Sequence, residues 1–349
     1  MYYMGIDHHK QYSHITVMDE KGSIIKADCV LNKRRKVENF LFDIGNEQLE
    51  AVIESGRSSY TMVDLLEDLG VKVKIAHPLQ VKAIAQAKIK TDKRDSKILA
   101  HLLRSDLIPE VWRRSSSNRQ AQRVLRHRMS YVKMQTRIKN QIRVLLSKQN
   151  EEIREMVEGG RALFSNSGME GLRKLKLPGK DKDILEALIR SLEHTRAEIK
   201  QSDALVKKLY SESPQAQLII TIPGFGTFLS VLVTTEIADI ERFSSDSRLH
   251  SYAGLVPSIY DTGQRSYHGR LVHQGNKHLR WAVVEAVWPA VRADCGISMM
   301  YQRIARRKGA NSAKIATARR LLTIIYRMLK EKRSYEFNKV NDSAAFLRN

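Results

Sequence analysis

The stretch YYMGIDHHKQYSHITVMDEKGSIIKADCVL, residues 2–31, decides the fold of the first third of the chain. Its first two segments, Tyr2–His9 and Tyr12–Glu20, are rich in aromatic and β-branched residues. A turn at Lys21-Gly22 separates the second segment from a third extended one, Ser23–Leu31. Segments of this composition, separated by short turns, predict a meander of three consecutive strands.

Helices and strands alternate after this meander. Apolar periodicity predicts helices at 36–44, 60–69 and 91–104, and compact apolar runs predict strands at 51–54 and 71–76. Three strands followed by alternating helices and strands predict an α/β domain with a ribonuclease H-like fold. Sugar kinases and actin-like ATPases begin in the same order, but the first third has no glycine-rich phosphate loop of the kind they use.

Four carboxylates stand at informative points of this predicted domain. Asp7 lies in the first strand, Glu54 ends the fourth, and Asp92 and Asp95 are three residues apart on one helix face. Phosphodiester chemistry uses such acids, because Mg²⁺ prefers oxygen ligands and two ions about 4 Å apart activate the attacking oxygen and stabilise the leaving one. We therefore predict a catalytic Mg²⁺ site formed by these four residues.

Each acid also has a structural explanation. Asp92 fits a helix cap, Asp95 fits an ion pair, and Glu54 fits the start of a loop. Asp7 is the hardest to explain in this way, because an acid inside an apolar strand is costly to desolvate without a cation or hydrogen bonds.

Other metal sites are less consistent with the sequence. The spacing of His8, His9 and His14 matches none of the usual zinc patterns. Cys29 and Cys295 are the only cysteines, and their separation excludes both a disulfide framework and a cysteine-based zinc site.

The composition indicates a folded polycation. The 349 residues include 60 Lys and Arg against 38 Asp and Glu, a net charge of +22, while 42% hydrophobic residues are enough for a core. Neither a run of eighteen apolar residues nor a signal-like N-terminus is present, so we expect a cytosolic (cytoplasmic) protein without membrane insertion. Its expected partner is nucleic acid first, and an acidic protein or anionic lipid surface second.

The charge is concentrated in two places. Val111–Asn150 holds eleven basic residues and no acid, and Arg265–Arg333 holds sixteen basic residues against three acids. A solvated helix face usually mixes both signs, so we predict contact with nucleic-acid phosphates. The candidate contacts are Arg119, Arg123, Arg126, Lys133 and Arg137 in the first stretch and Arg265, Arg270, Lys277, Arg280, Lys314, Arg319 and Arg320 in the second.

The first basic stretch is also periodic. Val124, Tyr131, Ile138 and Leu145 recur every seven residues, which predicts a helix long enough for a coiled coil. A second helix at Asp181–Tyr210 is expected to return antiparallel to it.

Two glycine-containing segments follow. Pro223-Gly224-Phe225-Gly226 lies between apolar runs and resembles a helix-hairpin-helix turn, in which Gly224 and Gly226 let backbone amides approach a phosphate; a tight turn in a helical core fits equally well. Asp261–Arg270 reads as a polar loop whose hydroxyls, histidine and arginines suit attack on phosphate.

Together these motifs resemble a known family over nearly the whole chain, the DEDD-type insertion-sequence transposases of the IS-one-ten group, relatives of the Piv pilin-gene invertase. The blocks that carry the resemblance are, in order, GID (5–7), VIES (52–55), KTDKRDSKILA (90–100), the basic middle, IPGFG (222–226), YAGLVP (252–257), GQRSYHGR (263–270) and QGNKHLRWA (274–282).

The resemblance implies a domain organisation and a function. It implies a resolvase-like (RuvC-like) domain at 1–112 with Mg²⁺ at the four acids, a basic coiled-coil region at 113–212, a mostly helical transposase domain at 213–335 and a tail at 336–349. It also implies a serine that joins covalently to DNA, assembly as dimers or tetramers, and a bridge RNA that pairs with donor and target DNA.

One residue departs from the family pattern. The family serine stands directly before the loop glycine, whereas this chain has Thr262 before Gly263. Either Thr262 is the nucleophile, or Ser266 takes its role, or this copy is impaired; position favours Thr262. A junction-resolving nuclease that uses metal-activated water, and a non-catalytic nucleic-acid-binding scaffold, remain alternative functions.

Overall fold

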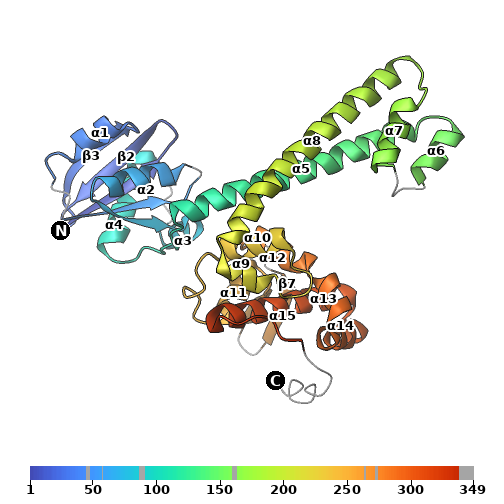
Figure 1. Ribbon diagram of the computed structural model, residues 1–349. Coiled ribbons are helices and arrows are strands. Elements are labelled where there is room, and N and C mark those ends of the chain that lie inside the picture. Colours follow the sequence, from blue (N-terminus) through green and yellow to red (C-terminus); the bar gives the residue numbers. More distant parts are fainter. Residues whose placement is uncertain are drawn as a thin grey trace. The chain divides into compact units, whose positions relative to one another are not determined.

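A computed structural model of the chain describes residues 1–44, 48–56, 58–85, 91–158, 163–262, 265–271 and 274–337 (Figure 1). Within these ranges the description does not extend to the side chains of residues 156–158, 259–268 and 270. The chain divides into two compact units, Met1–Arg113 and Arg114–Asn349. None of the described helices combines the length and the apolar character needed to cross a bilayer.

The first unit is built on a five-stranded mixed sheet with the order β3-β2-β1-β4-β5. The meander β1–β2–β3 is antiparallel, as predicted, and β4 and β5 run parallel to β1. The strands are β1 (Tyr2–His8), β2 (Tyr12–Met18), β3 (Ile24–Leu31), β4 (Leu49–Glu54) and β5 (Lys72–Ala76).

Helices cover both faces of this sheet. Met4, Ile6 and Ile53 lie in one core with residues of α1 (Arg34–Leu41) and α2 (Ser59–Asp68). Val52 and Ala76 lie in a second core with residues of α3 (Pro78–Ile84) and α4 (Asp92–Arg104). Because side chains alternate along a strand, the odd-numbered residues of β1 face α4.

Gly5 lets α4 lie directly against β1. A Cβ atom at this position would stand 2.0 Å from the Ser96 carbonyl oxygen and 2.4 Å from the Ala100 amide nitrogen, so no larger residue fits without moving the helix backbone. The glycine of the GID motif therefore sets the position of the N-terminal turn of α4, which carries Asp92 and Asp95.

Substituting Gly5→Ala should destabilise the first unit by about 1–3 kcal/mol, because the added methyl group overpacks a backbone-to-backbone contact. Thermal unfolding should show a lowered midpoint. Gly56→Ala is the matched control, since a Cβ there would meet nothing closer than 3.9 Å. Equal midpoints for the two variants would contradict the assigned role of Gly5.

The second unit begins with a long antiparallel helix pair, α5 (Ser116–Leu146) and α8 (Gly179–Ser211). The antiparallel arrangement follows from two bonds, Arg128 Nε to Asp203 Oδ1 at 2.5 Å and Gln149 Nε2 to Asp181 Oδ2 at 2.9 Å. The predicted return of the second helix is thus confirmed (Figure 1). Two short helices connect the pair, α6 (Glu151–Glu158) and α7 (Asn166–Lys174).

The rest of the second unit packs around α10 (Thr227–Ile237), in which every residue from Ser230 to Ile237 is buried. The cluster that includes its apolar residues also draws on α9, α11, α12 and α15. The elements are α9 (Pro214–Ile219), α11 (Asp246–Ala253), β6 (Pro257–Thr262), β7 (Arg265–Leu271), α12 (Lys277–Glu285), α13 (Val287–Ala293), α14 (Cys295–Lys308) and α15 (Ala310–Glu331).

The prediction of a loop at Asp261–Arg270 is wrong. The described part of its backbone, 261–262 and 265–270, belongs to the antiparallel hairpin β6–β7, with Tyr260 opposite Tyr267 and Thr262 opposite Arg265. The aromatic residues favour extended backbone, and a two-residue connection that starts with glycine is a hairpin signal.

Candidate metal centre and nucleic-acid interface

The sheet brings Asp7 and Glu54 to neighbouring positions. Ile6 and Ile53 are paired across the parallel strands β1 and β4, and Asp7 and Glu54 are the next residue of each strand. Since Ile6 and Ile53 face the α1–α2 side, the strand alternation places both acids on the opposite face, against α4.

The N-terminal turn of α4 brings the second pair of acids to the same place. The Thr91 side chain caps the helix by accepting a hydrogen bond from the Arg94 amide at 3.3 Å. One turn later, the buried Ser96 hydroxyl bonds the Thr16 hydroxyl of β2 at 2.8 Å and ties the helix to the sheet. Asp92 and Asp95 both lie in the first turn.

His9 stands between two of these acids. Its Nε2 atom lies 3.3 Å from Asp7 Oδ2 and 3.1 Å from Asp92 Oδ2. One ligand atom from each of Asp7, His9 and Asp92 lies within 4.8 Å of the others, which is close enough for one cation to contact all three.

The pKa of Asp7 is raised above its ordinary value, and burial is the largest cause. The charges of Asp92 and Asp95 raise this pKa further, while His9 opposes the shift by its charge and by a hydrogen bond. A bound cation would relieve both the repulsion among these carboxylates and the cost of burying Asp7.

Three residues at this centre were not predicted from the sequence as site residues, namely His9, Tyr12 and His14. His14 is the cross-strand partner of Asp7, and its Nε2 atom lies 3.8 Å from Asp92 Oδ2. The Tyr12 hydroxyl donates a long hydrogen bond of 3.5 Å to the same oxygen. The register of the first hairpin is the signal that predicts the place of His14, because cross-strand partners lie on the same face of a sheet as each other.

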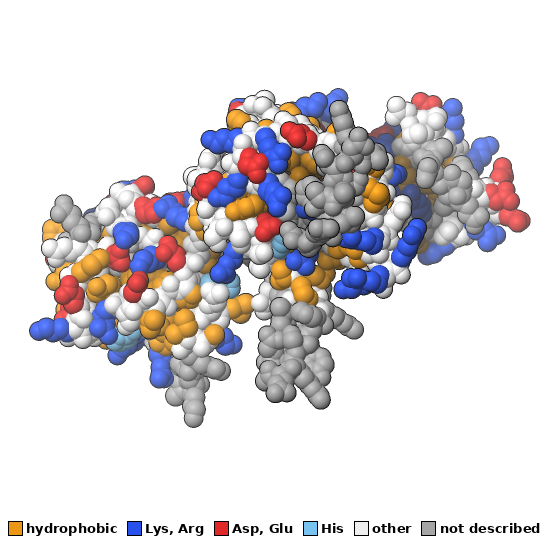
Figure 2. All heavy atoms as spheres, turned by 90° about the horizontal axis from the view of Figure 1, so that it is seen from below, with side chains coloured by type: hydrophobic (Ala, Val, Ile, Leu, Met, Phe, Trp, Pro, Cys, Tyr) orange, Lys and Arg blue, Asp and Glu red, His pale blue; other side chains and the backbone are white. Residues whose placement is uncertain are grey.

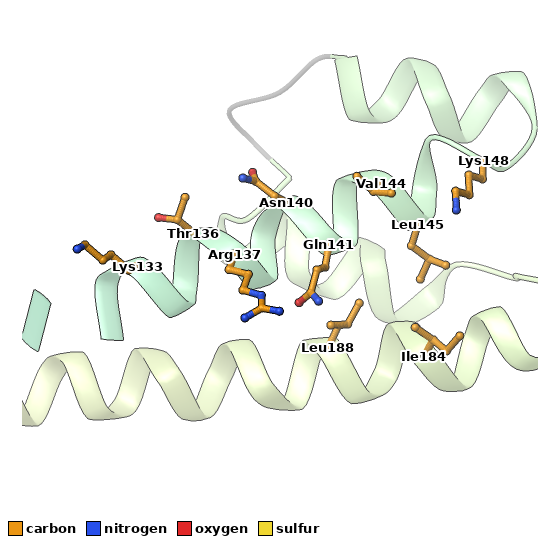
Figure 3. A pocket seen from close by; sticks show the side chains of 10 residues that line it. All are labelled: Lys133, Thr136, Arg137, Asn140, Gln141, Val144, Leu145, Lys148, Ile184 and Leu188. Carbon is orange, nitrogen blue, oxygen red and sulfur yellow. The ribbon is translucent and has the colours of Figure 1, made fainter. Parts of the chain in front are cut away.

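A groove between α5 and α8 collects part of the predicted basic surface (Figure 3). It has a volume of about 670 Å³ and combines the charges of Lys133, Arg137 and Lys148 with side-chain amides and apolar residues. Figure 3 shows Arg137 pointing toward Leu188 of α8. The other residues along it are Thr136, Asn140, Gln141, Val144, Leu145 and Ile184.

Among the other predicted basic contacts, the side chains of Arg265 and Arg270 lie outside the described part of the structure. Arg123, Lys277 and Arg319 are exposed, and Lys314 is half-buried. Arg119 donates to the Arg114 carbonyl at 2.9 Å, and Arg280 donates to the Ala253 carbonyl at 3.1 Å. Burial lowers the pKa of the half-buried Arg320. Figure 2 shows Lys and Arg side chains interleaved with apolar surface on one face.

Arg126 is exposed but belongs to a network centred on Glu236, whose side chain is completely inaccessible. The Arg126 guanidinium lies 3.2 Å from Glu236 Oε1, and Arg114 lies 3.4 Å from Oε2. Gln122 and Asn276 donate to Oε2 at 2.8 and 2.7 Å. The acid is therefore satisfied by charges and amides from α5 and from the start of α12.

This network also closes the base of the β6–β7 hairpin. The Asn276 amide donates to the Tyr252 carbonyl at 2.7 Å, which joins the residues on the two sides of the hairpin. Gly275, which directly precedes Asn276, has φ +124. A Cβ at this position would stand 2.8 Å from the Gly254 amide nitrogen, so the close approach of the two backbones requires glycine. The backbones of Thr262 and Ser266 are held by this hairpin, while their side chains lie outside the described part of the structure.

The two glycines of the predicted phosphate-binding turn differ in their surroundings. Gly224 has φ +93, and a Cβ there would stand 2.7 Å from the Ala286 carbonyl oxygen, so its packing alone explains the glycine. Gly226 precedes α10 as its N-cap and has open space around it.

Comparison with known proteins places these features in a family. A DEDD-type IS110 model described as "Transposase" matches residues 4–150, and the model "Transposase IS116/IS110/IS902 family" matches residues 216–302. The chain belongs to the IS110 family of insertion-sequence transposases. The resemblance seen in the sequence motifs is thereby confirmed, and membership implies an enzyme of DNA transposition that binds DNA.

Relatives of this IS110-family transposase share low identity over most of their length. The transposase for insertion sequence element IS1111A of Coxiella burnetii is 21% identical over 95% of this chain and 90% of its own. The pilin gene-inverting protein of Moraxella bovis is 27% identical over 76% and 74%. The transposase for insertion sequence element IS1328 of Yersinia enterocolitica is 22% identical over 81% of each chain.

Proposed function

We propose that this transposase acts as a site-specific recombinase. It cuts and rejoins DNA with Mg²⁺ bound at Asp7, Glu54, Asp92 and Asp95 and with a hydroxyl nucleophile on the β6–β7 hairpin. The proposal rests on the cluster of Asp7, His9 and Asp92, whose ligand atoms lie within 4.8 Å of one another where α4 packs on β1. The chain that carries this cluster belongs to a transposase family. The strand order β3-β2-β1-β4-β5 supports a ribonuclease H-like, RuvC-like fold for this unit.

The residues at this centre fit a divalent cation. Carboxylate oxygens are the ligands that Mg²⁺ and Mn²⁺ prefer, and the imidazole of His9 suits Mn²⁺ as well. The cation would lower the barrier by polarising the phosphate and stabilising the charge on the leaving oxygen. Asp7 and Asp92 would hold it, with Glu54 and Asp95 beside them.

The protein's own hydroxyl would carry the covalent step. The Thr262 oxygen forms a bond to phosphorus as the bond between phosphorus and the departing strand oxygen breaks. The proton of the threonine hydroxyl is lost, and the departing strand oxygen gains one. Reversal of this step on a second strand would rejoin the DNA. Ser266 is the alternative nucleophile.

The proposal also includes a nucleic-acid track, by which we mean the basic groove between α5 and α8 that would bind phosphates. The α5–α8 pair, which we infer to be a coiled coil, presents the groove with Lys133, Arg137 and Lys148 to phosphates. By the family resemblance we propose that a bridge RNA binds the protein and pairs with donor and target DNA, and that the protein works as a dimer or tetramer.

The test is a recombination assay with the purified protein, DNA carrying the element's ends, and the RNA transcribed from its flank. Joined product that requires Mg²⁺ and passes through a covalent protein–DNA adduct supports the recombinase. Metal-dependent cutting of branched DNA without an adduct would support a junction-resolving nuclease. Salt-sensitive binding without any cutting would support a non-catalytic scaffold.

Neutralising the groove should weaken nucleic-acid binding in a salt-dependent way. Changing Lys133, Arg137 and Lys148 to glutamine removes three phosphate contacts, so the slope of log affinity against log salt should fall by about 2.7. Filter binding at several salt concentrations measures this slope. The control triple variant changes Arg190, Lys200 and Lys207, which are exposed on α8 and do not line the groove. The same loss of slope in both variants would contradict a specific track.

A further inference from the structure

Trp281 is a large aromatic side chain left open on α12. Its relative exposure is 40%, and that of Trp288 on α13 is 46%. Tryptophan gains much free energy when its rings are covered, so exposed tryptophans are typical of binding surfaces. The two differ in their neighbours, because Trp288 already packs against Tyr301 with ring centroids 5.2 Å apart.

The Trp281 ring is held from one side. Phe228 of α10 contacts it at a centroid distance of 6.5 Å and a steep angle of 67°, so the two rings are not stacked face to face. The Arg128 guanidinium lies over Phe228 at 4.2 Å and is itself fixed by Asp203 at 2.5 Å. Helices α10 and α12 pack together, which makes this arrangement a preformed platform (Figure 1).

Charged side chains lie on both sides of Trp281 along α12. Lys277 is exposed one turn before Trp281, and Glu285 is exposed one turn after it. Burial lowers the pKa of the neighbouring His278, and the positive charges of Arg126, Lys277 and Lys133 lower it further, while Glu236 raises it. An exposed aromatic ring with the Arg128 guanidinium on its neighbour Phe228 and Lys277 one helical turn away suits an unpaired nucleobase with its phosphate better than an apolar protein segment.

The position of the platform indicates which strand would supply that base. Helix α12, which begins at Lys277, is the next element after the β6–β7 hairpin, which ends at Leu271, and the Asn276 amide bonds the Tyr252 carbonyl across the hairpin base. A strand of six residues spans about 20 Å, so a DNA strand held at the hairpin end would reach α12 within a few nucleotides. We propose that an unpaired base of the DNA strand attacked by the hairpin nucleophile stacks on Trp281, an inference that rests on the proposed function.

The intrinsic fluorescence of Trp281 provides the test. The chain has three tryptophans, so a Trp112→Phe, Trp288→Phe variant reports on Trp281 alone. Single-stranded DNA of the element's end should quench it strongly, and the same strand made abasic should not. Trp281→Ala should weaken binding of this DNA about 10-fold, as expected for the loss of one stacked base. Trp281→Phe should recover most of the affinity, and Trp288→Ala should change it less than about twofold.

Several results would overturn the proposal. Equal quenching by the abasic strand would show that the base does not stack, and quenching only by duplex DNA would show that it is not unpaired. Quenching by RNA but not by DNA would assign the platform to a guide. If DNA binds tightly but the fluorescence of Trp281 does not change, this inference fails and the proposed function stands. If the wild-type chain binds no DNA, the proposed function fails as well.

Discussion

Replacing Asp7 with asparagine should lower the rate of strand cleavage about 10³-fold or more. The substitution keeps the shape of the side chain and removes the partly buried negative charge that lies 3.3 Å from His9 Nε2. Metal ions supply several kcal/mol of transition-state stabilisation, and each 1.36 kcal/mol is a factor of ten in rate. The loss should not be recovered by raising the protein concentration, because it concerns the chemical step.

Binding of Mn²⁺ is an independent readout of the same change. Calorimetry or electron paramagnetic resonance should show binding to the wild type and strongly weakened binding to Asp7→Asn. The control is Asp28→Asn, which changes an exposed acid of β3 in the same sheet. The Asp7→Asn protein should unfold at or above the wild-type midpoint, since the variant no longer buries a charge. Normal cleavage by this variant would contradict the metal centre.

The local pattern was enough to predict the sheet and the pairs of acids. The β-branched and aromatic residues around GID and the compact apolar run AVIE indicate the strands, and the spacing of Asp92 and Asp95 indicates one face of a helix. These features depend on neighbours within a few residues. The contribution of Gly5 was not predictable, because its reason lies in the backbone of Ser96 and Ala100, about ninety residues later.

The residues that the sequence did not reveal depend on distant partners. His9 and His14 look like an isolated histidine group until the β1–β2 register and the approach of Asp92 place them beside the acids. Arg126 lies in a stretch without acids, and for that reason the sequence predicts a nucleic-acid contact there. In the structure it bonds Glu236, which lies 110 residues further along the chain. Part of the positive charge therefore stabilises the fold of the second unit.

The basic residues behind the net charge of +22 therefore fall into two groups, those paired with acids inside the protein and those on an open surface. Arg114 and Arg126 are bound to Glu236, and Arg128 is bound to Asp203. Lys133 and Arg137 line an open groove along the second half of the same helix α5, and Lys148 lies just beyond the end of that helix. We infer that α5 has two roles, because its first half joins the C-terminal core while its second half offers its charges to nucleic acid.

Replacing Thr262 with alanine should abolish the covalent protein–DNA adduct and lower recombination about 10³-fold or more, because removal of a nucleophile leaves only binding and electrostatic stabilisation. Thr262→Ser should keep the adduct and raise its rate of formation, since the threonine methyl group crowds the approach of the hydroxyl to phosphorus. Denaturing electrophoresis of labelled DNA measures the adduct directly.

Ser266→Ala separates the two candidate hydroxyls. The β6–β7 register pairs Ser266 with Asp261 and Thr262 with Arg265, so the two candidate residues lie on opposite strands of the hairpin, in adjacent pairs of its register. If Thr262 is the nucleophile, Ser266→Ala retains the adduct; loss of the adduct in Ser266→Ala alone would transfer the role to Ser266. Cleavage that survives both alanine variants but not Asp7→Asn would mean that water attacks the phosphate, because the metal centre then works without any hydroxyl from the hairpin.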